Sequence, residues 1–185
     1  ANTSVLSILQ DTLGDIWFAT VEGGLSRYSN QHGIETITNY TTQQGLPSNS
    51  INFLFQDHLG NLWIGTQLHG ISKLSISNRK KGRITFQNFS TKQGLSSNAV
   101  YCISEGHYGE IYVGTENGLN SLLPIKNNQY QLFLYTTANK LPDDFITNVI
   151  QLPDGKIAVG TNKGIAICKP TLFNPRQIVL QEIEI

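Results

Sequence analysis

The sequence predicts an all-β fold made of four four-stranded β-propeller blades, because one motif of about 46 residues recurs four times. Its first anchor glycines, Gly14, Gly60, Gly109 and Gly155, are 46, 49 and 46 residues apart. A second anchor, a glycine followed by Leu or Ile, lies at a nearly constant distance after each of them. Helical repeats would show apolar residues at 3.6-residue spacing, and this spacing is absent.

Each repeat divides into four short β-prone runs separated by turn residues. In the second repeat the expected strands cover residues 51–56, 62–65, 70–75 and 84–89. Asp57 is expected to cap the first hairpin through its side chain, and Gly60 to supply the positive φ that the turn needs. Leu62 and Ile64 alternate with period two, as do their equivalents in the other repeats. We therefore expect these faces to stack between neighbouring blades.

The repeat also sets the expected domain boundaries. The four blades occupy residues 1–169, with approximate bounds 3–45, 46–94, 95–141 and 142–169. Residues 170–185 form either a last, closing strand or the start of a following domain. Four blades are at the lower limit for a closed ring. We therefore expect the chain to be part of a larger propeller, or to self-associate and so complete a ring.

The second repeat is three residues longer than the others, and the extra residues fall near 77–82. A longer hairpin would absorb them. The basic run 79–83 lies in this insertion, and polybasic runs can bind polyanions. Because neutral sequence surrounds the run, we interpret it as a solvated loop.

Composition excludes several classes of partner. Lys plus Arg equals Asp plus Glu, at 13 each, so no net charge draws the chain to nucleic acid or to a membrane surface. No segment approaches the roughly 20 apolar residues that span a bilayer. We therefore predict no nucleic-acid partner and no membrane contact by this segment.

Residues that often carry chemistry have simpler structural explanations here. Cys102 and Cys168 are expected to be buried free thiols on different strands. The Asp11-x-x-Gly-Asp15 segment is expected to be a hairpin turn, since it lacks the alternating oxygen ligands of a calcium loop. Trp17 and Trp63 are expected in the core, in preference to a sugar-stacking role.

The four histidines lack the spacing of a metal site and are expected to be solvated turn residues; they are His32, His58, His69 and His107. We predict no catalytic residues, no metal site and no cofactor. The alternative, a polysaccharide lyase or hydrolase, requires an acid or histidine cluster on the channel rim. Residues of the first strands such as Ser7, Asn52 and Asn148 do not supply one.

Loops at one face of a propeller are the usual place for binding residues. The turns after the second strand of blades two, three and four are therefore our candidates. The candidate ligand-binding residues in these turns are Gln67, His69, Glu116, Asn117, Asn162 and Lys163.

Two recurring strings carry a family resemblance. Gly-Asn-Leu-Trp-Ile-Gly-Thr at 60–66 and Tyr-Thr-Thr-Gln-Gln-Gly-Leu-Pro-Ser-Asn-Ser-Ile at 40–51 resemble the two-component regulator propeller repeat. The resemblance covers residues 3–168 and weakens in the fourth repeat, where Ala158 replaces the aromatic residue and Asn139-Lys140 replaces Gln-Gly. It implies the extracytoplasmic, periplasmic sensor part of a bacterial inner-membrane protein, often with polysaccharide-derived ligands and dimeric signalling. It also implies that residues 170–185 begin a following β-sandwich domain.

The sequence therefore favours a non-enzymatic sensor propeller, with an oligosaccharide as the ligand implied by the resemblance. Any kinase activity would lie in cytoplasmic modules outside this segment. The alternative to the sensor is a structural propeller that holds protein partners together without a small ligand. The lyase or hydrolase is the third possibility, since fold alone does not fix function.

Overall fold

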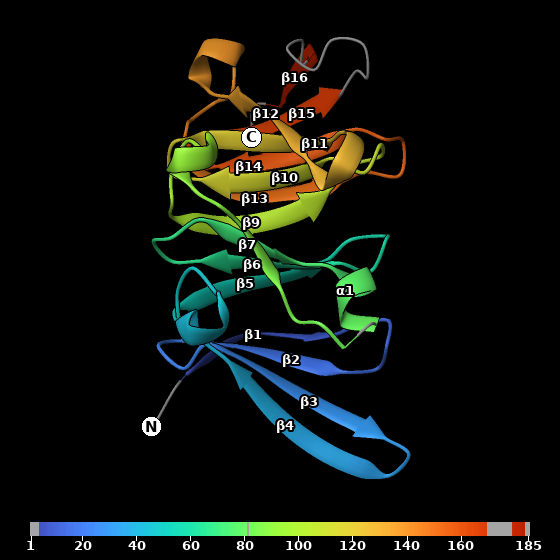
Figure 1. The fold of residues 1–185 in the computed structure, drawn as a ribbon. Helices are drawn as coiled ribbons and strands as arrows, with labels where there is room; N and C mark the ends of the chain where they lie inside the picture. The colour runs from blue at the N-terminus through green and yellow to red at the C-terminus, as the bar shows by residue number, and fades with distance from the viewer. Residues whose placement is uncertain (1–3, 81, 170–178, 184–185) are drawn as a thin grey trace. The chain divides into compact units, whose positions relative to one another are not determined.

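The computed structural model describes residues 4–80, 82–169 and 179–183, and over these residues the chain is built from antiparallel sheets (Figure 1). The described residues form four four-stranded sheets, and in each sheet the strands follow one another in chain order. This arrangement confirms the predicted all-β fold of four propeller blades. The chain divides into two compact units, Ala1–Ser90 and Thr91–Ile185, with two sheets in each.

The first unit contains sheets one and two. Their strands are β1 (Val5–Gln10), β2 (Ile16–Thr20), β3 (Leu25–Gln31), β4 (Ile34–Tyr40), β5 (Ile51–Gln56), β6 (Leu62–Thr66), β7 (Ile71–Leu74) and β8 (Phe86–Phe89). A one-turn 3-10 helix, Thr42–Gln44, joins the two sheets, and a short helix, α1 (Ile76–Lys80), lies between β7 and β8. The predicted first strand of the second repeat, 51–56, has the bounds of β5.

The second unit contains sheets three and four. Their strands are β9 (Val100–Glu105), β10 (Ile111–Thr115), β11 (Gly118–Pro124), β12 (Tyr130–Tyr135), β13 (Ile146–Gln151), β14 (Ile157–Thr161), β15 (Gly164–Lys169) and β16 (Val179–Ile183). Short 3-10 turns cover Thr91–Gln93, Lys126–Asn128 and Thr137–Asn139. β16 pairs antiparallel with β15, so it is the outer strand of sheet four. The assignment of 170–185 as a whole stays a prediction, because 170–178 and 184–185 lie outside the described residues.

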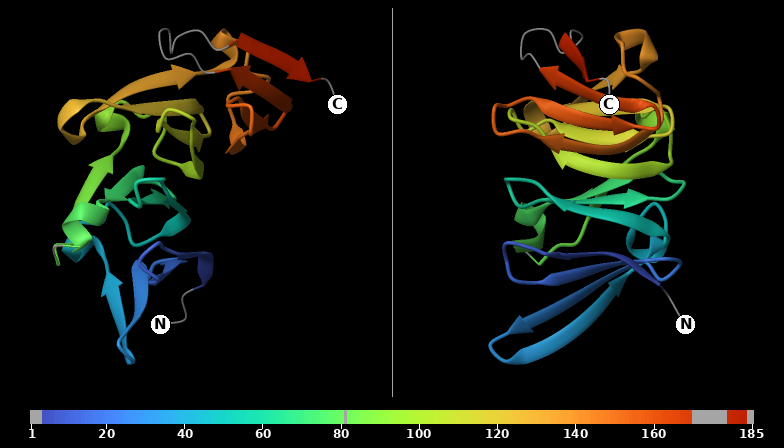
Figure 2. Two further views of the ribbon diagram at one scale, coloured as in Figure 1. Left: turned by 90° about the vertical axis from the view of Figure 1, so that its right-hand side faces the viewer. Right: turned by 180° about the vertical axis from the view of Figure 1, so that it is seen from behind.

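Within each unit the two sheets pack through their first strands: β1 and β2 contact β5, and β9 and β10 contact β13 (Figure 2). The inner strands of sheets two and three are the most buried, because each lies between two neighbouring strands. All five residues of β6 and all five of β10 are buried. Leu62, Trp63 and Ile64 expose 1% or less of their surface. The alternating apolar residues therefore form the core, as the sequence pattern predicts.

The hairpin between the first two strands of sheet two depends on one carboxylate. Asp57 Oδ1 accepts a hydrogen bond from the backbone N–H of Asn61 at 2.7 Å, and Gly60 adopts φ 83°. Asp57 Oδ2 also accepts the indole N–H of Trp63 at 2.9 Å. The prediction of a side-chain-capped turn is therefore confirmed. The same carboxylate additionally anchors the aromatic ring at the centre of the sheet.

Sheet three builds the same anchor from different residues. Glu110 Oε1 accepts the hydroxyl of Tyr112 at 2.9 Å, and Glu110 Oε2 accepts the backbone N–H of Tyr108 at 2.9 Å. Gly106 stands at the position of Asp57, and a Cβ there would lie 2.5 Å from the Glu110 carboxyl. The carboxylate thus comes from the residue after the turn in sheet three and from the residue before the turn in sheet two. The glycine at position 106 leaves room for the Glu110 side chain.

The connections between sheets share a capped turn. The Thr41 hydroxyl accepts the N–H of Gln43, and Asn49 Oδ1 accepts the N–H of Thr42 at 2.9 Å. Equivalent bonds join Thr91 to Asn98 and Thr137 to Asp144. The recurring Tyr-Thr-Thr and Ser-Asn residues thus stabilise the connection through hydrogen bonds. This structural role explains why they recur, and no ligand-binding role is needed.

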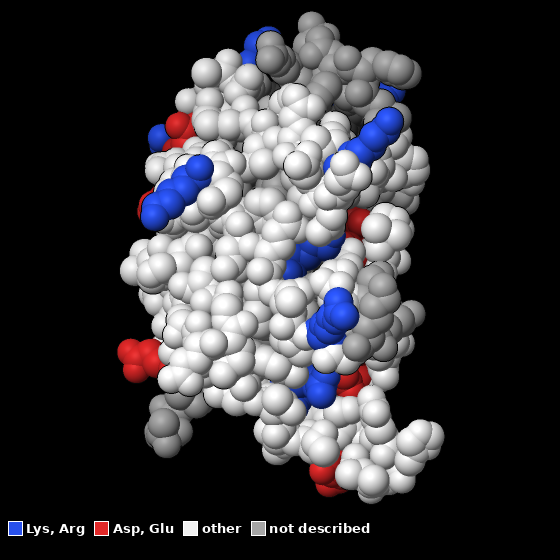
Figure 3. Space-filling model, viewed as in Figure 1, with Lys and Arg blue, Asp and Glu red and all other residues white. Residues whose placement is uncertain are grey.

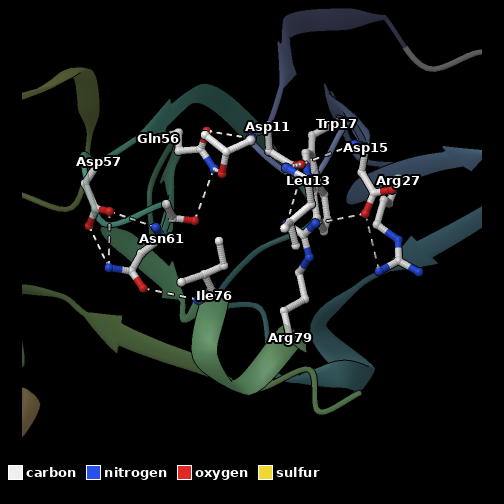
Figure 4. Close-up of polar contacts among 12 residues, drawn as sticks. Asp11, Leu13, Asp15, Trp17, Arg27, Gln56, Asp57, Asn61, Ile76 and Arg79 are labelled. Carbon is white, nitrogen blue, oxygen red and sulfur yellow. Dashed lines mark hydrogen bonds and ion pairs between the residues drawn. The ribbon is translucent and has the colours of Figure 1, made fainter. Parts of the chain in front are cut away.

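The insertion in the second repeat forms α1 instead of a longer hairpin, and the predicted solvated basic loop is wrong at Arg79 (Figure 4). The Arg79 side chain is 4% exposed. Its Nη1 donates to Asp11 Oδ2 at 2.6 Å and its Nη2 donates to Asp15 Oδ2 at 2.9 Å. The guanidinium also lies 5.2 Å from the centre of the Trp17 ring. Ion pairs with two buried carboxylates of sheet one therefore hold the Arg79 side chain in the interior.

Replacing Lys140 by glycine should stabilise the protein by about 0.5–1 kcal/mol. Lys140 adopts φ 72° at the turn where Gly45 and Gly94 adopt 103°. A left-handed conformation costs a residue with a Cβ about 1–2 kcal/mol, and the larger unfolded-state entropy of glycine offsets part of the gain. Urea unfolding measures the difference. Lys140→Ala is the control and should give no gain; equal stabilisation by both variants would contradict this account.

Replacing Arg79 by methionine should lower the free energy of unfolding by about 3 kcal/mol, because Asp11 and Asp15 would stay buried without their cation. Burial raises the pKa of Asp11, but hydrogen bonds from Arg79 and Trp17 outweigh it and hold the pKa below its ordinary 3.8. Asp11 therefore adds stability above about pH 3.8, and this stability is lost as the pH falls through the lower folded-state value.

Urea unfolding at a series of pH values tests both effects. The Arg79→Met variant should begin to lose stability at a higher pH than the unaltered chain. Arg83→Met is the control, since Arg83 is exposed and belongs to the same basic run. Similar losses in the two variants would show that the buried ion pairs contribute nothing specific.

Candidate functional site

The predicted binding residues lie where expected, in the turns between the second and third strands of sheets two, three and four. All six are exposed. Gln67 and His69 belong to the first unit. Glu116, Asn117, Asn162 and Lys163 belong to the second unit, where they lie at the same end of two adjacent sheets. Their binding role stays a prediction, and we describe the geometry of the second-unit group, which we call the turn-end site.

Each of these turns is attached to the connection that leads into the same sheet. Ser97 Oγ donates to Glu116 Oε1 at 2.9 Å. Lys163 Nζ lies 2.7 Å from Asp143 Oδ2. In the first unit, the backbone N–H of Gln67 donates to Ser50 O at 3.2 Å. The turns are therefore held in place, and the connections contribute Ser97 and Asp143, which the sequence argument missed.

The ion pair in sheet four orients the lysine without burying it. Lys163 is 74% exposed and Asp143 is 16% exposed. Their hydrogen bond raises the pKa of Lys163 and lowers the pKa of Asp143. Exposed ion pairs contribute little to stability. The pair instead presents a charged group and an acceptor at a fixed place on the surface.

An aromatic pair joins sheets three and four at this end. The rings of Tyr101, on β9, and Phe145, just before β13, have centroids 4.7 Å apart and an interplanar angle of 43°. Tyr101 is 40% exposed. The backbone N–H of Asn162 donates to Phe145 O at 3.3 Å, so the predicted turn lies beside this pair. The turn-end site therefore combines an accessible aromatic surface with polar groups.

Sequence reasoning missed the aromatic pair, although the repeat contains a signal for it. Tyr101 occupies the register position of Asn52 in sheet two and Thr147 in sheet four. Phe145 stands where sheet two has Ser50. None of the equivalent positions in the other sheets is aromatic, since sheet one has Leu6 at the position of Tyr101 and sheet three has Ala99 at the position of Phe145. The two rings therefore depart from the blade pattern.

The tryptophans lie in the core, as predicted, and are not available to a ligand. Trp17 and Trp63 each expose 0% of their surface, and their indole N–H groups donate to Asp11 and Asp57. The Asp11–Asp15 segment is a hairpin turn, as predicted, with Asp11 accepting the backbone N–H groups of Leu13 and Asp15.

The described residues contain free, buried thiols and scattered histidines. Cys102 and Cys168 are both unpaired and buried, as predicted, and burial raises the pKa of each thiol to about 12. Neither is therefore a thiolate near neutral pH. His32, His58, His69 and His107 are all exposed on turns, as predicted. Over the described residues, no three His, Cys, Asp or Glu side chains gather in a group that could hold a metal ion.

Charged side chains are sparse on the face drawn in Figure 3, where they lie scattered among uncharged ones. The formal net charge of the chain is zero. None of the described helices has both the length and the apolar composition to cross a membrane.

Comparison with known protein families identifies the repeat. Residues 45–67 and 94–117 match the model of the two-component regulator propeller. These two segments therefore carry the motif of the two-component regulator propeller. Each matched segment begins at the left-handed glycine of a connection and ends in the turn after the second strand. The match thus covers the end of the connection and the aromatic anchor, and confirms the resemblance seen in the sequence. No relative was found among curated protein sequences.

Solved structures share this fold. The extracellular domain assigned to a hybrid two-component system of B. thetaiotaomicron is 23% identical, with a TM-score of 0.74 over 97% of this chain and 23% of that one. A second such domain from B. thetaiotaomicron is 22% identical, with a TM-score of 0.73 over 98% of this chain and 25% of that one. This chain therefore spans about a quarter of the length of these two domains.

An enzyme shares the fold as well. Virginiamycin B lyase from Staphylococcus aureus is 14% identical, with a TM-score of 0.65 over 98% of this chain and 56% of that one. Because sensors and a lyase share the blade arrangement, the fold alone does not decide between binding and catalysis. That choice depends on the side chains at the turn-end site.

Proposed function

We propose that this chain is part of an extracytoplasmic, non-enzymatic sensor propeller that binds a carbohydrate at the turn-end site. The observation that carries the proposal is the accessible Tyr101–Phe145 pair beside the hydrogen-bonding turns of sheets three and four. Similarity to extracellular domains of two-component systems supports the sensor role and the location outside the cytoplasm. The polar groups around the pair are turn amides, one ion pair and the Glu116 carboxylate, which accepts a hydrogen bond from Ser97; this set suits recognition better than bond cleavage.

The chemistry of the turn-end site favours a sugar ring. An aromatic surface binds the apolar C–H face of such a ring, while amide and carboxylate groups bind its hydroxyls. Asn117 and Asn162 supply amides, and Glu116 and Asp143 supply acceptors. Glu116 and Asp143 are held by Ser97 and Lys163, so little entropy of these two side chains would be lost on binding.

Replacing Tyr101 by alanine should weaken carbohydrate binding about three- to tenfold, because it removes one ring of the stacking surface. Calorimetry or a thermal shift assay with a panel of oligosaccharides measures the effect. Tyr108→Ala is the matched control, since Tyr108 is 42% exposed but lies in the turn at the other end of the same sheet.

Binding that is equally weakened by both substitutions would contradict the turn-end site. No response to any oligosaccharide would contradict the proposed ligand class. In that case, a stable protein partner found by crosslinking would favour a structural propeller that acts without a small ligand.

We also propose that further blades, or a second chain, cover the free face of sheet one. On this face Ile8 is 62% exposed and Ile37 is 79% exposed. In sheet two, Leu54 occupies the register position of Ile8 and is 5% exposed. The apolar pattern that packs sheet two against sheet one is thus repeated on sheet one, where it meets solvent.

Size-exclusion chromatography with light scattering should show that the chain self-associates as its concentration rises, and Ile8→Lys should weaken this association. A lysine on the free face would place a charge in the new contact. Leu59→Lys is the control, because Leu59 is equally exposed, at 64%, but lies in a hairpin turn. A chain that stays monomeric at every concentration would contradict association through this face.

A further inference from the structure

The outer hairpin of sheet one contains a recess of about 260 Å³, separate from the turn-end site. It is lined by Arg27, Ser29, Gln31, His32, Ile34 and Thr36. This volume lies below the roughly 300–1,000 Å³ of sites that hold drug-sized ligands, so the recess fits a smaller molecule.

Strand alternation places these side chains together. Residues two apart on β3 share one face, and on β4 the cross-strand partners of Ser29 and Gln31 are Thr36 and Ile34. His32 and Gly33 close the hairpin with φ 54° and 80°, the positive angles of a tight two-residue turn. The recess therefore lies on one face of a single hairpin, at the end of sheet one opposite its turn between β2 and β3.

Arg27 is the only cation in the lining, and its guanidinium lacks a close acceptor. Its Nε is buried and has no hydrogen-bond partner in the described part of the chain. Asp15 Oδ2 lies 3.9 Å from Arg27 Nη1, too far for a hydrogen bond, and already accepts Arg79 Nη2 at 2.9 Å (Figure 4). A buried N–H without an acceptor is unfavourable, so the guanidinium of Arg27 has hydrogen-bonding capacity that the described residues do not use.

Packing alone does not explain why this position holds an arginine. Lys73 occupies the same register position in sheet two, with its Nζ 5.6 Å from the centre of the Trp63 ring. Arg27 lies similarly over Trp17, at 5.9 Å. A lysine is thus sufficient for the cation–π contact with the tryptophan in sheet two. Arginine adds a planar fork of N–H donors, the geometry that matches a carboxylate.

We propose that this recess binds the carboxylate of a small organic acid through the guanidinium group of Arg27. No Asp or Glu lines the recess. Ser29, Gln31 and Thr36 offer hydrogen bonds to the rest of the ligand, and Ile34 offers an apolar wall. The two nearby aspartates, Asp11 and Asp15, are already balanced by Arg79 and Arg27, so a singly charged carboxylate is favoured over a dianion such as phosphate.

NMR titration of the ¹⁵N-labelled 185-residue chain tests the proposal. The probes are acetate, D-glucuronate, D-glucose and inorganic phosphate. Glucuronate and glucose differ by a carboxylate in place of a hydroxymethyl group, so they isolate the contribution of the charge. We expect both carboxylates to shift the amides of β3 and β4, with glucose causing no comparable shift.

Arg27→Gln should weaken binding of the carboxylates at least tenfold, and Arg27→Lys should weaken it severalfold despite keeping the charge. Lys126→Gln is the control, because it removes one positive charge from an exposed turn of the second unit. Thr36→Phe leaves Arg27 intact and fills the recess, so it should abolish binding. Amide spectra of each variant verify that the hairpin is folded.

The relative affinities identify the source of the carboxylate. Tighter binding of glucuronate than of acetate supports a sugar acid, and equal binding supports a simple organic acid. Equal shifts by glucose and glucuronate, tighter binding of phosphate than of either carboxylate, or unchanged binding in both Arg27→Gln and Thr36→Phe would each overturn the proposal. These outcomes leave the turn-end site untouched, because it involves other residues in the second unit.

Discussion

The hydrogen bond between a buried carboxylate and an aromatic side chain is the interaction on which sheets one, two and three depend. In sheet two, Asp57 joins the turn backbone to the Trp63 indole, and in sheet three Glu110 joins it to the Tyr112 hydroxyl. One acidic side chain thus fixes both the hairpin and the ring at the centre of the sheet. A buried carboxylate is costly unless every oxygen has a donor, so the turn, the ring and the register are specified together.

This anchor also explains why sheet one holds an additional cation. Asp11 binds the Trp17 indole in the same way as Asp57 binds that of Trp63. Sheet one differs at the residue after the turn, where Asp15 adds a second buried carboxylate and sheet two has Asn61. A second negative charge requires compensation, and Arg79 on α1 supplies it through bonds to both aspartates. The insertion in the second repeat therefore meets an electrostatic need created in the first.

The periodic part of the structure could be predicted from the sequence, and the contacts between blades could not. Glycine spacing and period-two alternation depend on local geometry. These patterns therefore predicted the positions of strands and hairpins, including β5. Arg79 was misassigned because its partners lie 68 and 64 residues away, and a basic run looks the same whether solvated or buried. Tyr101 and Phe145 escaped notice for the same reason, since their contact joins strands of different sheets.

Contacts between sheets are also where the proposed ligand binding would be coupled to the proposed sensor role. A ligand changes a conformational equilibrium only by its difference in affinity for the two states. Tyr101 belongs to sheet three and Phe145 leads into sheet four, so a ligand stacked on both rings binds best when β9 and β13 keep their present contact. Each turn is bonded to its own sheet, as Glu116 is to Ser97. The preference of the ligand for one contact would therefore act on each sheet as a rigid body. Binding at the turn-end site would therefore stabilise one packing of sheets three and four.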